Sequence, residues 1–143
     1  MTQVARAYAA GAAEGPALML REALSLWGGI DLDTGCIIDR SHPDAGTCVT
    51  GRILVMPSGR GSSSSSAVLA EAIRRGTGPA AIVLGGADPI LTVGAIVAAS
   101  LYGLECPIVV CPIASFATGL RLRVIADDRG MATVSVVDPG PRA

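Results

Sequence analysis

The sequence predicts one compact α/β domain with a mixed, barrel-like sheet and two main helices. Half of its 143 residues are hydrophobic and only 16% are charged, which is the composition of a folded chain and not of a disordered one. Short aliphatic runs typical of strands alternate with two helix-like segments in the second half of the chain. No linker or internal repeat divides the sequence, so residues 1–143 are expected to form a single domain.

The first fifty residues are expected to be rich in β-structure. Val4–Tyr8 and Ala17–Arg21 have the composition of short strands, on either side of the turn-forming pair Gly15-Pro16. Leu26–Asp31 is expected to be a loop that holds the only tryptophan of the chain, and Cys36–Ile38 a further strand.

A strand followed by a helix is expected at the centre of the chain. Arg52–Met56 is an apolar, strand-like run. Ala67–Arg75, which follows after ten further residues, has the pattern of a helix. Gly76 is expected to end this helix as its C-cap, because glycine tolerates the left-handed conformation found there. Arg74 and Arg75 would lie in the last turn, where positive charge suits the helix dipole.

A second strand and a second helix come next. Ala80–Leu84 is predicted to be a buried strand. Asp88 is the predicted N-cap of the second helix, and Pro89 takes the first helical position, where its missing N–H is no loss. The helix is expected to end near Tyr102, and Pro107–Val110 to be the third strand of a β-α-β-α-β order.

The chain is expected to close with a β-hairpin. Its two strands would be Arg121–Ala126 and Thr133–Val137, joined across the turn Asp127–Gly130. With the β-rich first part, these strands would wrap a layer that has the two helices on it.

The most informative segment is Pro57–Ser66, which lies between the central strand and the first helix. Gly59 and Gly61 let the backbone approach a ligand closely, and the first turn of a helix presents unpaired N–H groups and the positive end of its dipole. Five consecutive serines add hydroxyl donors, and Arg60 adds a guanidinium that suits carboxylate or phosphate. The segment therefore predicts an anion site; the alternative is a flexible serine loop in which one serine caps the helix.

Several classes of function are disfavoured by the composition. The net charge is −1 with no basic patch, so nucleic acid is not expected as a partner. The longest apolar run, Ile90–Leu104, is too short to span a bilayer, and the N-terminus has no signal-like apolar stretch, so a cytoplasmic protein without membrane contact is expected. The lysine of a phosphate-binding P-loop and the glycine pattern of a dinucleotide fold are both absent.

Three further features leave alternatives open. His42, the only histidine, is either a base or phosphate carrier or a structural loop residue. Ser62, His42 and Asp39 would allow a Ser-His-Asp arrangement, although the Gly-x-Ser-x-Gly elbow is missing. Trp27 is either a partner-facing anchor or a core residue.

The four cysteines lack metal-binding spacing and are interpreted as buried, inert thiols.

Several segments in order resemble the small subunit of aconitase X. The resemblance covers the chain from about Gly11 to Val110. The segments that carry it are Leu26–Asp31, Gly35–Pro43, Gly51–Ser63, Asp88–Leu91 and Gly94–Ala98.

The resemblance implies a fold and an activity. The fold would be the swivelling β/β/α domain of aconitases, and the activity that of a two-chain hydro-lyase acting on a small carboxylate. The large subunit of aconitase X would carry the iron or iron–sulfur centre, and this chain would bind no metal and be inactive alone. Cis-3-hydroxy-L-proline is the favoured substrate, since a composition rich in Ala and Gly and without lysine is typical of GC-rich bacteria; mevalonate 5-phosphate comes next.

The resemblance also implies roles for the serine loop. In aconitases a Gly-x-Gly-Ser-Ser segment supplies a catalytic serine, which corresponds to Ser62 here. Aconitase proper continues with arginine where this chain has serine, so the substrate contacts differ. The residues expected to bind substrate are Arg60, Gly61, Ser63 and Ser64.

Two other classes of function are alternatives to the hydro-lyase. The segment 95–107 is similar to that of phosphohistidine swivelling domains, which carry a phosphorylated histidine just before this helix. Thr92 and Val93 stand there in this chain, which disfavours a carrier. The other alternative is a non-catalytic interaction domain whose serine loop only caps a helix.

Overall fold

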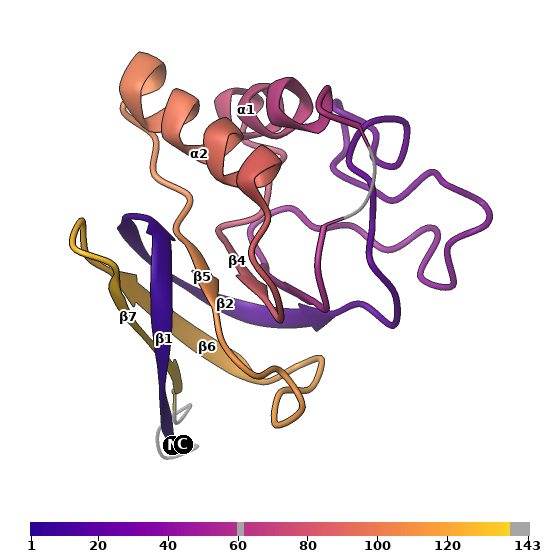
Figure 1. The fold of residues 1–143 in the computed structure, drawn as a ribbon. Coiled ribbons are helices and arrows are strands. Elements are labelled where there is room, and N and C mark those ends of the chain that lie inside the picture. Colours follow the sequence, from indigo (N-terminus) through magenta and orange to yellow (C-terminus); the bar gives the residue numbers. More distant parts are fainter. Residues whose placement is uncertain (60–61, 138–143) are drawn as a thin grey trace, which may run out of the picture.

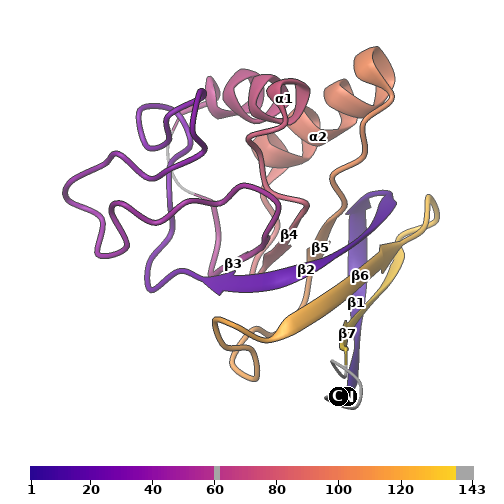
Figure 2. The same cartoon turned by 180° about the vertical axis from the view of Figure 1, so that it is seen from behind.

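Seven strands close into a barrel, and two helices lie side by side against one part of it (Figures 1 and 2). The structure is a computed structural model that describes residues 1–59 and 62–137. The strands follow one another around the barrel in the order β1-β5-β4-β3-β2-β6-β7. Their bounds are β1 Thr2–Ala9, β2 Gly11–Met19, β3 Ile53–Met56, β4 Ala81–Leu84, β5 Ile108–Val110, β6 Arg121–Ala126 and β7 Met131–Val136; the helices are α1 Ser65–Arg75 and α2 Pro89–Tyr102.

The barrel combines a parallel and an antiparallel part. β3 pairs in parallel with β2 and β4, and β4 pairs in parallel with β5. β1, β6 and β7 pair with their neighbours in antiparallel fashion. β3, β4 and β5 are connected through α1 and α2, whereas the parallel strands β2 and β3 are joined by the long loop of residues 20–52. The mixed, barrel-like α/β fold predicted from the sequence is therefore confirmed.

Every residue of β3 and β4 is buried, because these strands are covered on both faces. One face, with Leu54 and Ile82, packs against the helix residue Leu69. The other face, with Ile53 and Val83, belongs to the cluster that fills the barrel. Buried aliphatic side chains on both faces hold these strands, and so the loops that follow them, in place.

Both helices end, and α2 also begins, where local sequence signals place them. Gly76 and Gly103 follow the last turns with φ of 78° and 65°, in the left-handed region that favours glycine. Asp88 caps α2 and Pro89 is its first residue, as predicted. No helix in the described part of the chain is long and apolar enough to cross a bilayer; α2, the longer, has 14 residues.

Two predicted elements of the first part are wrong. Gly15-Pro16 is not a turn but lies inside β2, which pairs with β6 from Gly11 to Pro16. Proline fits there because the pairing with β3 begins only at Ala17, so the missing N–H removes no bond to that strand. Cys36–Ile38 does not form a regular strand and makes only isolated bridges, from Cys36 to Cys48 and from Ile37 to Ile30.

The cysteines divide into two kinds, so the prediction of four inert thiols is half wrong. Cys36 and Cys48 form a disulfide across the long loop between β2 and β3. Cys106 and Cys111 are buried thiols, as predicted. Burial raises the pKa of Cys106 to about 12 and raises that of Cys111 as well, because an apolar surrounding disfavours the thiolate.

Thiol labelling with iodoacetamide tests this division, because the thiolate is the reactive form and burial suppresses it. We expect the folded, unreduced protein to react very slowly at all cysteines. Unfolding without reductant should expose only Cys106 and Cys111, and reduction should then add Cys36 and Cys48, each located by mass spectrometry. Labelling of Cys36 in the unfolded, unreduced chain would contradict the disulfide.

Candidate functional site

The site lies where the two helices begin. Since β3 and β4 are parallel neighbours, the loops that follow them start at the same edge of the sheet. The first loop leads to α1 and the second, Gly85–Asp88, leads to α2. The N-terminal ends of both helices, which carry partial positive charge, therefore lie close together.

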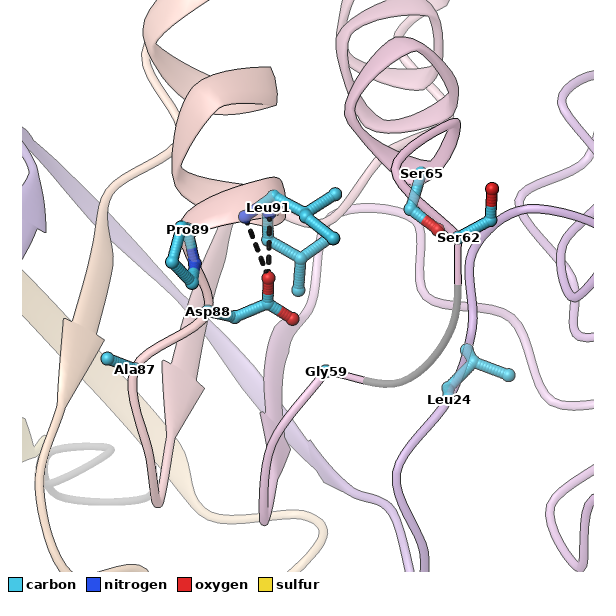
Figure 3. A pocket seen from close by; sticks show the side chains of 9 residues that line it. Leu24, Gly59, Ser62, Ser65, Ala87, Asp88, Pro89 and Leu91 are labelled. Atoms are coloured by element: carbon cyan, nitrogen blue, oxygen red, sulfur yellow. Dashed lines mark hydrogen bonds between the residues drawn. The ribbon is translucent and has the colours of Figure 1, made fainter.

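A pocket of about 200 Å³ opens between these helix starts. Figure 3 shows Ser62 and Ser65 at the start of α1, Asp88 at the start of α2, and Leu24 and Gly59 on the remaining wall. The residues that line it are Leu24, Gly59, Ser62, Ser65 and Ala87–Leu91.

Two contacts fix the two helix starts relative to each other. The Ser66 hydroxyl donates a hydrogen bond of 2.6 Å to the carbonyl oxygen of Ile90. Gly94, on the next turn of α2, has no side chain where a Cβ would lie 2.7 Å from the carbonyl oxygen of Ser66. The helices thus approach closely beside the pocket, and the spacing between its walls is set by backbone contacts.

Asp88 connects the two loops. One carboxylate oxygen, Oδ1, accepts hydrogen bonds from the N–H groups of Ile90 (2.9 Å) and Leu91 (3.1 Å) and so caps α2. The other, Oδ2, lies against Gly59, where a Cβ atom would overlap it. A side chain at position 59 would therefore displace the carboxylate of Asp88 from its capping position, so the starts of the two loops are packed closely together. The sequence indicated the cap but gave no signal for the contact with Gly59, which depends on the pairing of β3 with β4.

Ser62 lies at the positive end of α1. Its hydroxyl oxygen accepts a hydrogen bond of 3.1 Å from the N–H of Ser64, and its carbonyl accepts one of 3.0 Å from Ser65. Within the described chain, Ser64 at the N-cap makes no side-chain cap hydrogen bond. The side chain of Ser64 therefore does not cap α1. The hydroxyl of Ser62 instead accepts the N–H of Ser64, so a serine hydroxyl does satisfy a donor at the start of the helix, as the alternative of a helix-capping serine loop expects.

Of the four residues predicted to bind substrate, the structure describes two. Arg60 and Gly61 lie outside the described residues. Ser63 and Ser64 are described; both are exposed at the start of α1 and lie outside the pocket lining. Ser65, which was not singled out, is buried in the lining, and its hydroxyl oxygen accepts the N–H of Trp27 at 3.1 Å.

His42 has a structural role. It is buried; its Nδ1 accepts the N–H of Asp44 at 3.0 Å, and its Nε2 lies 3.1 Å from the carbonyl oxygen of Glu22. Because Nδ1 accepts, Nε2 carries the proton and donates it to that carbonyl. Both ring nitrogens are occupied by backbone groups, so neither is available to Ser62, and the Ser-His-Asp alternative is not assembled.

The described residues do not fit a metal centre. Across residues 1–59 and 62–137, no three His, Cys, Asp or Glu side chains come together in a group that could hold a metal ion. Two of the four cysteine sulfurs are bonded to each other, and the other two are buried. No step of the chemistry is therefore assigned to a metal bound by this chain.

Comparison with known proteins identifies the family. The family model for the aconitase X swivel domain matches residues 2–134. The chain belongs to this family.

Similar aconitase X proteins support the assignment. The chain is 41% identical over 134 residues to a cis-3-hydroxy-L-proline dehydratase of Hypocrea jecorina, a match that covers 94% of this chain but only 22% of that protein. It is 48% identical over 83 residues to a phosphomevalonate dehydratase small subunit of Methanopyrus kandleri, covering 58% of this chain and 62% of the other. The crystal structure of Thermococcus kodakaraensis aconitase X in its holo-form superposes with a TM-score of 0.85 and 32% identity, covering 96% and 99% of the two chains.

Substitution of Asp88 tests the link between the two helix starts. Asp88→Ala removes the acceptor for two N–H groups and should lower the free energy of unfolding by about 1 kcal/mol. Asp88→Asn keeps an acceptor oxygen and should retain most of the stability. Urea denaturation measures both, with Asp128→Ala in the exposed hairpin turn as the control, expected to stay within about 0.5 kcal/mol of the parent. An Asp88→Ala variant as stable as the control would contradict the capping role.

Proposed function

We propose that this aconitase X swivel domain is the small subunit of a hydro-lyase, a single domain that closes over a substrate held by a larger polypeptide. The observation that carries the proposal is the position of Ser62, which lines a pocket at the start of α1 and whose hydroxyl accepts the N–H of Ser64. The dehydratases among its relatives support the type of reaction. An iron or iron–sulfur centre, which the resemblance to aconitase X implies, would belong to the larger polypeptide.

Ser62 is proposed as the base. It would take a proton from the carbon next to a carboxylate, the electrons of that C–H bond would form the double bond, and the hydroxyl on the next carbon would leave, ultimately as water. A free serine hydroxyl is almost as weak an acid as water, so its alkoxide must be stabilised. The N–H of Ser64 on Oγ and the dipole of α1 supply the preorganised positive field that this requires.

The same helix end suits a carboxylate substrate. Ser63 and Ser64 are exposed beside the pocket, so their hydroxyl groups are accessible to a substrate that approaches from outside. Arg60 and Gly61 are proposed to complete the contacts, the first through its guanidinium and the second through close backbone approach. The pocket of this chain alone is small and open to water, which weakens every electrostatic interaction in it.

Cis-3-hydroxy-L-proline is the proposed substrate. The match to the Hypocrea jecorina enzyme of that name extends over 94% of this chain, whereas the match to the Methanopyrus kandleri small subunit extends over 58%. Mevalonate 5-phosphate is the second candidate, because the phosphomevalonate dehydratase small subunit of Methanopyrus kandleri is, like this chain, a short polypeptide, of which the match covers 62%. A direct comparison of the two substrates in a dehydration assay distinguishes them.

A phosphate carrier receives no support from the start of α2. A carrier would need a histidine there, and the hydroxyl of Thr92 instead donates to the carbonyl oxygen of Asp88 at 2.9 Å. The second candidate function is that of a non-catalytic interaction domain, and the next experiment distinguishes it from a hydro-lyase subunit.

The variant Ser62→Ala tests the catalytic role in the assembled enzyme. Removal of a positioned base should lower kcat by about 10²- to 10⁴-fold while the two chains still co-elute. Ser135→Ala, on β7 and outside the pocket lining, serves as the matched control and should retain its kcat. Near-normal turnover with Ser62→Ala would favour the interaction domain.

The chain alone is expected to be inactive, because its pocket is open to water and the partner that would close the site and supply the remaining substrate contacts is missing. Dehydration of both candidate substrates should be undetectable with the purified chain and should appear when the larger polypeptide is added. Turnover by the purified chain without a partner would contradict the proposal.

A further inference from the structure

α2 carries no charged residue and is mostly apolar, although only one side of it is buried. Leu91, Gly94, Ala95 and Ala98 face the protein. The opposite side exposes large apolar residues, and the whole segment from Pro89 to Leu104 contains no charged residue. The exposed apolar residues on that side, which we call the outer face of α2, are Val93, Ile96, Val97 and Leu101; the exposed Ser100 lies among them. A helix without charges that exposes several large apolar side chains is normally covered by another surface, so this face is expected to be covered in the functional assembly.

The outer face continues from the pocket. Pro89 and Ile90 line the pocket, and Val93 and Val97 follow one and two turns along the same helix. The exposed side chain of Trp27 lies beyond the other helix start, since its backbone N–H binds the hydroxyl of Ser65 in the pocket. A body that closed over the pocket would therefore meet apolar surface on both sides of the opening.

A second apolar patch lies on the barrel, away from the helices. Val4, Ile125 and Met131 are exposed there and border a shallow groove between β1, β6 and β7. None of its lining residues belongs to the pocket with Ser62. This barrel patch supplies a matched comparison, because it offers apolar side chains of similar size without continuity to the site.

We infer that the outer face of α2 is the docking surface for the larger polypeptide of the aconitase X enzyme. This inference rests on the proposed two-part hydro-lyase. The relatives indicate which partner binds this face. This chain spans 22% of the Hypocrea jecorina dehydratase, so about four-fifths of that enzyme is polypeptide that this chain lacks. Such a polypeptide, if it completes the pocket, must come up to the start of α2.

The lack of charge on this face determines which interactions can hold the partner. With no charge between Pro89 and Leu104, association through this face must depend on burial of apolar area. The affinity should therefore change little between low and high salt, unlike that of an interface built on ion pairs.

The experiment uses the full chain and the larger polypeptide of the same host, identified by its similarity to the unmatched four-fifths of the Hypocrea jecorina enzyme. The double variant Val97→Glu with Leu101→Glu places two charges on the outer face and should weaken Kd at least about 100-fold, because burial of unpaired charge is unfavourable. Ile125→Glu with Met131→Glu on the barrel patch is the control and should change Kd less than about threefold. Circular dichroism and urea denaturation verify that both variants fold.

A photo-crosslinking residue at position 97 in the otherwise unaltered chain gives a readout that does not depend on a destabilising change. Crosslinks from position 97 to the larger polypeptide, with none from position 131, would support the inference. Crosslinks to a second copy of this chain, or association lost only in the barrel variant, would overturn it and leave the two-part enzyme intact. Dehydration by this chain without any partner would instead overturn the proposed function.

Discussion

The parallel pairing of β3 with β4 is the constraint on which the site depends. It brings the two following loops out at one edge, so that two helices begin beside each other. The loops touch directly: a Cβ on Gly85 would lie 2.8 Å from the carbonyl oxygen of Pro57. Four fully buried residues in each strand hold this edge in place. The pocket that Ser62 lines lies at that edge, and the close contacts of Ser66 with Ile90 and Gly94 fix the spacing of the two helix starts beside it.

The positive ends of the two helices would each attract an anion, but the residues at these two ends differ. At α2 the carboxylate of Asp88 neutralises the helix end and lies against Gly59. At α1 no acidic residue lies in the first turn, and the N–H of Ser64 points at the hydroxyl of Ser62. We propose that the end without an acidic residue is the reactive one, because the hydroxyl of Ser62 lies there in the positive field of the helix dipole.

Sequence reasoning succeeded where the signals were local. Gly76, Gly103 and the Asp88-Pro89 pair mark helix ends through backbone conformation and capping, which depend on a few neighbouring residues. It failed where the answer lay in pairing between distant segments. Gly15-Pro16 has turn composition but is held straight by β6, and the Cys36–Cys48 disulfide depends on a loop path that spacing does not reveal. The contact of Asp88 with Gly59 was missed for the same reason.

The central claim is that the hydroxyl of Ser62 meets the reacting carbon of a substrate once a partner covers the pocket. A crystal structure of the two-chain assembly with a bound hydroxy-acid analogue tests it most directly. We expect the Ser62 oxygen to lie about 3–3.5 Å from the carbon that loses its proton, inside a site closed to water. An analogue bound far from Ser62, with the start of α1 facing solvent, would contradict it.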